Sequence, residues 1–405
     1  MTFALGVVLF ALGVAVSVAL HEAGHLWAAR RLGMKVRRFS LGRGPMLFSV
    51  RRGETDYGLG LIPVGGFCEI AGTTALDELT PDEYDRALYR QKTWKRLVVM
   101  SGGIGMNFLL AGVLVLVLAV GWGLPELHPK VVVESVGCVP SSQRPGPGYG
   151  LAACDGPGPA AAAGIRPGDV ILAVDGEGVT RFGDLVGKIW DSAGVVELTI
   201  ERHGRRLVLP VATEQVQRWV VDPRTGAERS TAVGAIGVSA HPPAGPVRYD
   251  VVTAVPAALA FTGDLAVLTA RTVVDLPTKV ASLWRSVTGG ERDADTPISV
   301  VGAGSLGGRA VERGAWESFV LLLVSLNLFV GLFNLLPLLP LDGGHMAVAI
   351  YEGLRNRVRA RLGRPGGAPV DFVKLLPVTY AFVVVGGAFM LLTLAADIVA
   401  PVRPA

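Results

Sequence analysis

Two histidines and a glutamate lie within five residues near the start of the chain, in the run His21-Glu22-Ala23-Gly24-His25. On a helix, residues four apart share one face, so both imidazoles can bind one zinc ion. Zinc lowers the pKa of a coordinated water to about 7, and a neighbouring carboxylate can accept that water's proton. We therefore predict His21 and His25 as zinc ligands and Glu22 as the catalytic residue. The alternative is a buried polar cluster that helps helices to associate.

A catalytic zinc usually has three protein ligands and an open position for water. The strongest candidate for the third ligand is Asp342, in the segment N-L-L-P-L-L-P-L-D-G-G-H from Asn334 to His345. Two prolines break the apolar segment there, and irregular backbone at membrane depth is tolerated only where it lines protein or a water-filled cavity. The alternative places Asp342 at a helix end in the membrane interface. His345 is a possible ligand by chemistry, but its position after two glycines favours a supporting or surface role.

The elements that carry these residues are expected to lie in a membrane. Half of the 405 residues are apolar and only 18% are charged, whereas soluble domains average about 25% charged residues. Four apolar stretches reach the roughly 20 residues that a bilayer requires. We predict spans at Phe3–Ala29, Leu97–Trp122, Trp316–Leu339 and Val373–Val399. The first is read as a retained span and not as a signal peptide, because no basic residue precedes it and no cleavage site follows it.

The positions of the basic residues predict the orientation. Arginines and lysines flank the span ends in the first loop, from Arg30 to Arg96, and in the third loop, from Arg355 to Arg364. The positive-inside rule places both loops in the cytoplasm and the region Lys130–Arg313 outside. The net charge of +4 is too small to argue for nucleic acid, and the chain has no P-loop or dinucleotide fingerprint. We therefore expect no nucleic-acid partner.

The outer region contains a soluble part with strand-like runs between Lys130 and Thr213, while Tyr249–Val287 has the spacing of an amphipathic helix on the membrane or the core. Of the three cysteines, Cys138 and Cys154 bracket a loop rich in proline and glycine. Their position on the outer, oxidising side predicts a disulfide between them, with Cys68 left unpaired. A bond closing a loop of about 15 residues stabilises by roughly 3 kcal/mol in the entropy model.

The motifs together resemble the site-2 protease family of intramembrane zinc metalloproteases, in the bacterial subgroup of the regulator of sigma-E protease type. The resemblance covers H-E-x-x-H in the first span and the N-x-x-P-x-x-x-L-D-G segment in a late span. It also covers Gly58-Leu-Gly60 with Pro63–Phe67, which look like the family's membrane-associated β-hairpin, and Ser101–Phe108, which resembles the family's G-P-x-x-N-F. The chain departs from the family pattern at Leu339-Pro340 and at Gly103-Ile104.

The resemblance implies a multi-pass protein of the plasma (inner) membrane, with its active site near the cytoplasmic side. Its substrates would be single-span membrane proteins such as anti-sigma factors, cut within the bilayer in regulated intramembrane proteolysis. The segment Ala163–Ile171 with Val174-Asp175-Gly176 resembles PDZ domains of bacterial proteases. A PDZ groove binds an extended peptide as an added strand, and the alternative is a compact domain that only keeps bulky proteins out.

A helical substrate must be unwound before it is cut. The hairpin Gly58–Phe67 offers an unpaired strand edge for the opened segment, so we predict Gly58 and Gly60 as substrate-binding residues. Asn334 could hydrogen-bond the substrate backbone or the developing oxyanion, or else serve as a cap or an interhelical bond.

The expected fold is an α-helical membrane protein with four transmembrane spans, a membrane-associated β-hairpin and an inserted extracytoplasmic α+β PDZ domain. The expected domains are a membrane core at 1–126, a PDZ domain at 127–215, a linker and amphipathic helical region at 216–313, and a second part of the membrane core at 314–405. A zinc-binding membrane scaffold or metal carrier is the alternative function. Glu22 distinguishes the two, because a scaffold needs the metal ligands but no general base.

Overall fold

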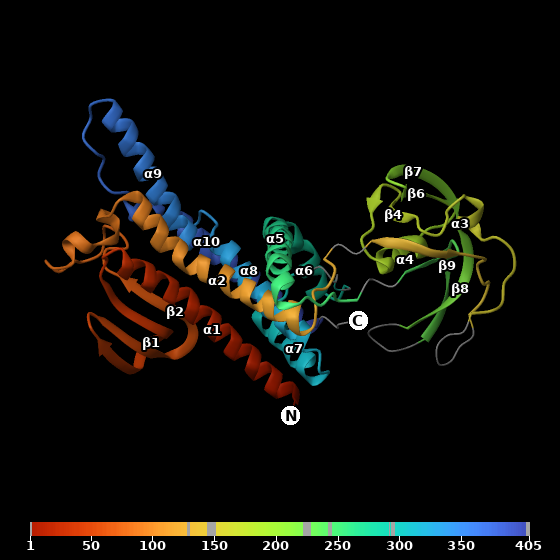
Figure 1. The fold of residues 1–405 in the computed structure, drawn as a ribbon, viewed down its shortest axis with the longest axis horizontal. Helices are drawn as coiled ribbons and strands as arrows, with labels where there is room; N and C mark the ends of the chain where they lie inside the picture. Colours follow the sequence, from red (N-terminus) through yellow and green to blue (C-terminus); the bar gives the residue numbers. More distant parts are fainter. Residues whose placement is uncertain are drawn as a thin grey trace. The chain divides into compact units, whose positions relative to one another are not determined.

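The computed structural model describes residues 2–127, 130–143, 151–221, 228–241, 245–290, 292 and 296–401. The chain forms two compact units, which we describe separately. The first comprises Met1–Leu124 together with Val247–Ala405, and the second is Pro125–Pro246. Figure 1 shows the first unit as a bundle of long helices with a small sheet, and the second as a mixed α and β unit. The second unit is thus inserted into the sequence of the first.

Long apolar helices build the first unit. They are α1 (Thr2–Arg31), α2 (Thr93–Gly121), α5 (Val251–Asp275), α6 (Val280–Val287), α7 (Val300–Glu312), α8 (Trp316–Asn334), α9 (Asp342–Arg361) and α10 (Leu376–Val399). Single-turn 3-10 helices lie at Tyr84–Arg86, Leu88–Arg90, Leu276–Lys279 and Phe372–Leu375. The apolar side chains of α10 are mostly exposed, as expected of a helix that contacts lipid.

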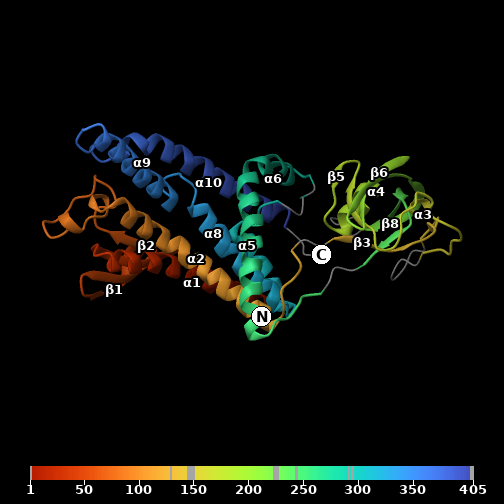
Figure 2. The same cartoon turned by 45° about the horizontal axis from the view of Figure 1, so that its top comes forward.

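Five helices in the described part of the chain are long and apolar enough to cross a membrane. Four of them, α1, α2, α8 and α10, correspond to the expected spans. The fifth is the helical segment Val251–Val287, with a mean hydropathy of 1.8, where we expected an amphipathic helix. Figure 2 shows its first part, α5, lying across the bundle that α1, α2 and α8 form. Length and apolar composition alone therefore do not give the number of crossings.

Strands β1 (Val36–Arg52) and β2 (Thr55–Ile70) form a sheet that is more than a simple hairpin. Ser40 pairs with both Phe67 and Gly58, and Gly58 pairs with both Ser40 and Ser49. Each long strand therefore folds back and contributes two segments to the sheet. Within the described residues, the segment from Ile62 to Ile70 has pairing partners on one side only, so it is an edge of the sheet.

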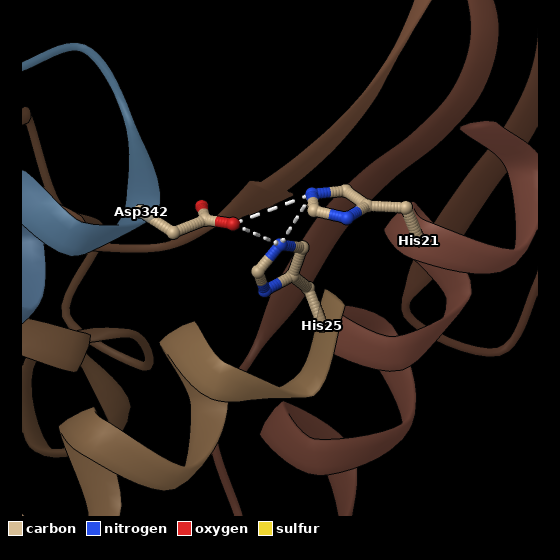
Figure 3. Close-up of side chains that lie close together, drawn as sticks. All are labelled: His21, His25 and Asp342. Carbon is tan, nitrogen blue, oxygen red and sulfur yellow. Dashed lines mark hydrogen bonds and ion pairs between the residues drawn. The ribbon is translucent and has the colours of Figure 1, made fainter. Parts of the chain in front are cut away.

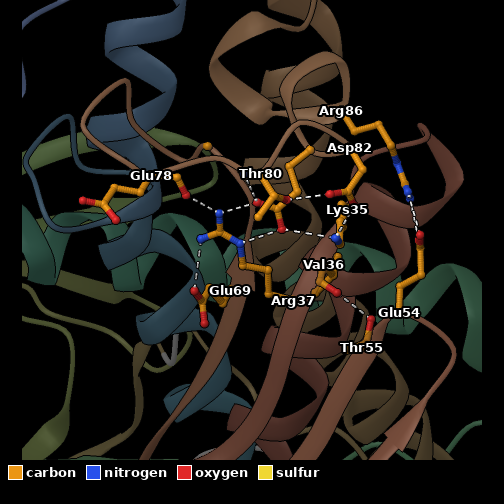
Figure 4. Close-up of polar contacts among 12 residues, drawn as sticks. Lys35, Val36, Arg37, Glu54, Thr55, Glu69, Glu78, Thr80, Asp82 and Arg86 are labelled. Atoms are coloured by element: carbon orange, nitrogen blue, oxygen red, sulfur yellow. Dashed lines mark hydrogen bonds and ion pairs between the residues drawn. The ribbon is translucent and has the colours of Figure 1, made fainter.

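Ion pairs hold the base of this sheet to the loop that precedes α2 (Figure 4). Arg37 on β1 donates to the carboxylate of Glu83 at 2.6 and 2.9 Å, and it also pairs with Asp77 at 3.0 Å. Arg86 binds Glu54 in the turn between the strands, with both nitrogen–oxygen distances within 2.9 Å. Glu83 is 3% exposed, and the hydrogen bonds from Arg37 hold the pKa of its carboxyl well below the usual value. The paired carboxylate therefore anchors the sheet at neutral pH.

The second unit contains a sheet in the strand order β10-β3-β4-β6-β7, with β5 beside β4. Its strands are β3 (Val131–Val136), β4 (Val170–Val174), β5 (Glu177–Gly178), β6 (Val195–Arg202), β7 (Arg205–Ala212) and β10 (Val238–Ala240). A separate pair is formed by β8 (Glu214–Val221) and β9 (Glu228–Ala235), and the helices are α3 (Pro159–Ala162) and α4 (Phe182–Trp190). Apolar residues of β3, β4, β6 and α4 form the core.

The domain boundaries differ from the expected ones. The second unit extends to Pro246, whereas we expected a linker to begin at residue 216. The strands β8, β9 and β10 were not expected, because polar residues, prolines and glycines interrupt the apolar pattern in this part of the sequence. The rest of the expected linker, from Val247 onward, belongs to the helical unit.

Candidate metal centre

The structure brings together the three residues that the sequence analysis selected as zinc ligands (Figure 3). His21 and His25 lie on α1, and Asp342 is the first residue of α9. The Nε2 atoms of the two histidines are 3.3 Å apart. The Oδ2 atom of Asp342 lies 3.3 Å from each of these nitrogens. The three potential ligand atoms thus form a nearly equilateral triangle.

This triangle fits a zinc ion. Zinc binds histidine nitrogen and carboxylate oxygen at about 2.0–2.2 Å in tetrahedral geometry, so two ligand atoms lie about 3.3–3.5 Å apart. All three observed separations agree with that spacing. Asp342 Oδ2 is also buried without a hydrogen-bond partner, which is costly for a carboxylate unless a cation compensates it. Three protein ligands would leave one coordination position for water, as a catalytic zinc site requires.

Contacts of the other ring nitrogen, Nδ1, orient both imidazoles so that Nε2 faces the centre of the triangle. His25 Nδ1 donates to the backbone carbonyl of Val99 on α2 at 2.8 Å, which leaves the Nε2 lone pair for a metal. His21 Nδ1 lies 3.2 Å from the side-chain amide of Asn107, also on α2. The atom of Asn107 that faces this nitrogen is Nδ2. With a metal on His21 Nε2, Nδ1 carries the proton, so the Asn107 amide has to turn over for its oxygen to accept. Asn107 is only 1% exposed, so α2 supplies an orienting partner to each histidine.

Small residues allow α1 and α2 to approach closely at this point. A side chain on Gly24 of α1 would lie 2.2 Å from the carbonyl oxygen of Gly102 on α2. A Cβ atom on Gly103 would lie 2.4 Å from His25 Nε2 and 2.8 Å from His21 Nε2. Gly103 therefore leaves open the space into which both nitrogens point. Sequence reasoning missed this role, although it had noted Gly103 in a family motif.

The broken segment before α9 delivers Asp342 to the centre. Helix α8 ends at Asn334, and α9 starts directly at Asp342. The next two residues allow a close approach of backbone: Cβ atoms on Gly343 and Gly344 would lie 2.4 Å and 2.6 Å from backbone atoms of the preceding loop. Only glycine fits at these two positions, which explains the Asp-Gly-Gly sequence.

Glu22 lies beside the centre on the side of the sheet. A Cβ atom on Gly66 of β2 would be 2.6 Å from Glu22 Cγ, so the edge segment of the sheet runs directly along this side chain. Cys68 on the same segment is a free thiol. Burial raises the pKa of that thiol to about 12, and the nearby Glu22 carboxylate adds to the effect. The half-buried Cys68 is therefore a neutral thiol at physiological pH.

The remaining predicted site residues lie elsewhere. Gly60 pairs with Met46 and closely approaches Arg43, so both Gly60 and the doubly paired Gly58 lie inside the sheet. The free edge at residues 62–70 includes the second half of the expected hairpin Gly58–Phe67, but not Gly58 and Gly60, because the strands fold back on themselves. Asn334 is the half-buried last residue of α8.

His345 stacks on Phe372 with ring centroids 5.7 Å apart, and it does not belong to the group of possible metal ligands among the described residues. In the second unit, Cys138 and Cys154 are joined by a disulfide, with Cα atoms 5.8 Å apart. The loop between these cysteines is described only in part, since residues 144–150 lie outside the described residues.

Comparison with known proteins shows the family of the chain. The model of peptidase family M50 matches residues 9–378, which include His21, His25 and Asp342. The chain belongs to peptidase family M50, the site-2 proteases. The zinc metalloprotease Rip1 of Mycobacterium tuberculosis is 50% identical over 405 residues, covering 100% of this chain and 99% of the relative. Rip1 of Mycolicibacterium smegmatis is 46% identical over 99% of both chains, and metalloprotease MmpA of Caulobacter vibrioides is 28% identical over 86% of both.

Membership in this M50 family establishes the class of the protein. It is a multi-pass membrane protein and an intramembrane zinc metalloprotease, and zinc is its cofactor. The alternative of a metal-binding scaffold without catalytic activity is therefore set aside.

Proposed function

We propose that this M50 protease binds zinc through His21, His25 and Asp342 and cleaves transmembrane segments of single-span membrane proteins. The observation that carries the proposal is the triangle of ligand atoms with three separations of 3.3 Å. When bound, zinc supplies a Lewis acid that activates water and polarises the scissile carbonyl. Glu22 accepts the proton of the attacking water and delivers it to the leaving amine. Its place between the histidines and Gly66 suits this role.

The contacts in the first unit support four crossings. The chain enters α5 beside the end of α2, where the Tyr249 N–H donates to the carbonyl of Ala119. It leaves the α5–α6 segment beside the end of α10, where Arg292 donates to the carbonyl of Ala400 at 3.0 Å. The following helix, α7, contacts the first turns of α1 at Phe3 and Phe10. These positions mark one end of the bundle, so α5 and α6 enter and return on the same side.

The basic residues support the orientation. Arg30 and Arg31 end α1, and Lys92 precedes α2, at the opposite end of the bundle from Tyr249. The arginines of the second half of α9 extend beyond Thr93, the first residue of α2, against which Gly353 of α9 packs. By the positive-inside rule this end is cytoplasmic. The second unit is then extracytoplasmic, where the disulfide is stable. Reporter fusions at residues 200 and 360 are expected on opposite sides of the membrane.

The edge of the sheet supports a site for the unwound substrate. Residues 62–70 have a free edge among the described residues, and Gly66 on this edge contacts Glu22. A substrate segment added as a further strand would be held extended beside the metal ligands. Asn334, the last residue of α8, stays a proposed substrate-binding residue through its side-chain amide. Gly58 and Gly60 would then act by shaping the sheet, since their own backbone is paired.

The second unit supports the PDZ interpretation. A groove of about 340 Å³ runs between α4 and β10, with apolar lining from Leu185, Ile189 and Val238. Strand β10 pairs only with β3 among the described strands, so its other edge can accept a peptide strand over this groove. Cys138 also lines the groove, and the disulfide would fix the loop beside it. These features favour peptide binding over mere exclusion of bulky proteins.

Metal analysis and turnover of Glu22→Gln together test the proposal. Wild-type protein is expected to hold one zinc, and His21→Ala and Asp342→Ala to lose it. Glu22→Gln keeps zinc and thermal stability but loses roughly 10²–10⁴ in rate on a single-span substrate. Full zinc content in Asp342→Ala would remove this residue from the site. Wild-type turnover by Glu22→Gln would refute its role as the base.

A further inference from the structure

A buried ion pair joins α2, which contacts both histidines, to α9, which begins with Asp342. Arg96 of α2 donates to the carboxylate of Glu352 on α9, and each of the two residues is only 7% exposed. The second oxygen of Glu352 accepts from the backbone N–H of Val370 at 2.6 Å. The pair therefore fixes three segments to one another: α2, α9 and the return loop toward α10. Neither residue takes part in the chemistry described above.

The pair closes a ring of contacts that includes the metal ligands. Three residues after Arg96 on α2, the Val99 carbonyl orients His25. Ten residues before Glu352 on α9, Asp342 faces His25 Nε2 at 3.3 Å. Ten residues of helix correspond to about 15 Å of a stiff rod. Because α9 is stiff, the point on α2 to which Glu352 is bound sets the position of Asp342 relative to the histidines.

The other contacts between α9 and its neighbours fix this position less well. Met346 packs against the apolar cluster that includes Val99 and Met100 of α2, and Gly353 packs against the side chain of Thr93. Packing contacts of this kind are not directional, so they resist a small sliding motion weakly. Zinc ligands must lie within about 0.2 Å of their ideal distances. Asp342 also follows an irregular loop, which cannot define its position alone.

We propose that Arg96 and Glu352 are positioning residues for the metal centre, which hold α9 at the register that brings Asp342 to the zinc. This inference rests on the proposed ligand set. Removing one charge would leave the other buried and unpaired, so that it would draw its helix toward water. Outer partners of metal ligands typically change metal affinity by roughly 10–100-fold, and we expect Glu352→Gln to weaken zinc binding by that factor.

The chain contains a matched control at the other end of the bundle. Arg292 and Asp397 form a second buried ion pair at 2.6 Å, with side chains 6% and 5% exposed. Asp397 accepts from the backbone N–H of Ser299 at the start of α7, so it joins α7 and α10 as Glu352 joins its three segments. Neither α7 nor α10 carries a predicted metal ligand. Asp397→Asn should lower the melting temperature without changing zinc affinity.

The test measures zinc affinity by chelator competition, and the visible spectrum after Co²⁺ substitution, on full-length protein in detergent. Melting temperature is recorded for the same samples. A further variant, Arg96→Met with Glu352→Leu, replaces the pair by apolar side chains, which often restores stability. Positioning predicts that its melting temperature recovers while zinc affinity stays low and the Co²⁺ spectrum stays altered. A merely structural role predicts that zinc affinity recovers together with stability.

Three results would overturn the inference: wild-type zinc affinity in Glu352→Gln, an equal loss of affinity in Asp397→Asn, or recovery of zinc affinity together with stability in the double variant. Failure of the ligand set itself is recognised separately. In that case the wild-type protein binds zinc no more tightly than His21→Ala, whatever the ion-pair variants do.

Discussion

Gly103→Ala offers a sharp test of the metal centre, because it adds one carbon atom at the point where the ligand atoms converge. The new Cβ would lie 2.4 Å from His25 Nε2, and an ordinary contact needs at least 3.4 Å. The His25 ring or the backbone of α2 must therefore move by about 1 Å. Zinc ligands tolerate deviations of about 0.2 Å, so such a shift removes a ligand from the coordination sphere.

We expect Gly103→Ala to fold but to lose zinc and activity. Alanine in place of glycine within a helix favours the helix by about 0.5–1 kcal/mol, which offsets part of the strain. Gly105→Ala is the control on the same helix, since a Cβ there meets no atom within 4 Å. It should keep zinc and activity and melt at the wild-type temperature or slightly above it.

Zinc content, zinc affinity by competition and cleavage of a single-span substrate measure the effect of both variants. If Gly103→Ala binds zinc with wild-type affinity, the ligand atoms do not converge where the structure places them. If both variants lose zinc equally, the loss comes from the helix and not from the added carbon atom.

Three further predictions concern residues near the centre and the sheet. Asn107→Leu should keep the fold but lower zinc affinity by roughly 10–100-fold, because it removes the partner of His21 Nδ1. Unchanged affinity would show that this contact does not contribute to zinc binding. Cys68 should resist labelling by a water-soluble thiol reagent until the protein is denatured, because burial raises its pKa to about 12, and rapid labelling of native protein would contradict this. The hydrogen bonds from Arg37 lower the pKa of the Glu83 carboxyl, so this carboxylate stabilises the fold above the usual glutamate pKa and loses that effect as the pH falls below it. Glu83→Gln should therefore weaken the dependence of the free energy of unfolding on pH in the acid range, and an unchanged dependence would refute the assignment.

The residues of the proposed metal centre could be selected from the sequence because each of the two short motifs carries its own local signal. The spacing of His21 and His25 needs only one helical turn, and the prolines before Asp342 mark where the helix must break. In the second unit, the strands near Val131, Val170 and Val195 and the helix near Asp184 were also visible from apolar alternation.

Other features depend on tertiary contacts that a local pattern does not contain. The doubling back of β1 and β2 makes Gly58 an interior residue, although its sequence reads as one simple hairpin. The roles of Gly103 and Gly66 arise from the close approach of separate elements. An unusual polar residue in an apolar span, Asn107, was a usable signal of function, but its partner could not be read from the sequence.

The order of the proposed zinc ligands along the chain has a consequence for the synthesis of the enzyme. His21 and His25 emerge from the ribosome with the first helix, whereas Asp342 follows only after the whole second unit and α8 have been made. Until then the nascent chain has two imidazoles and no third ligand, which is too few for a catalytic zinc site. With this ligand set the protease would stay inactive while it is being inserted, and a chain that stops short of α9 would be unable to cut the membrane proteins assembled beside it.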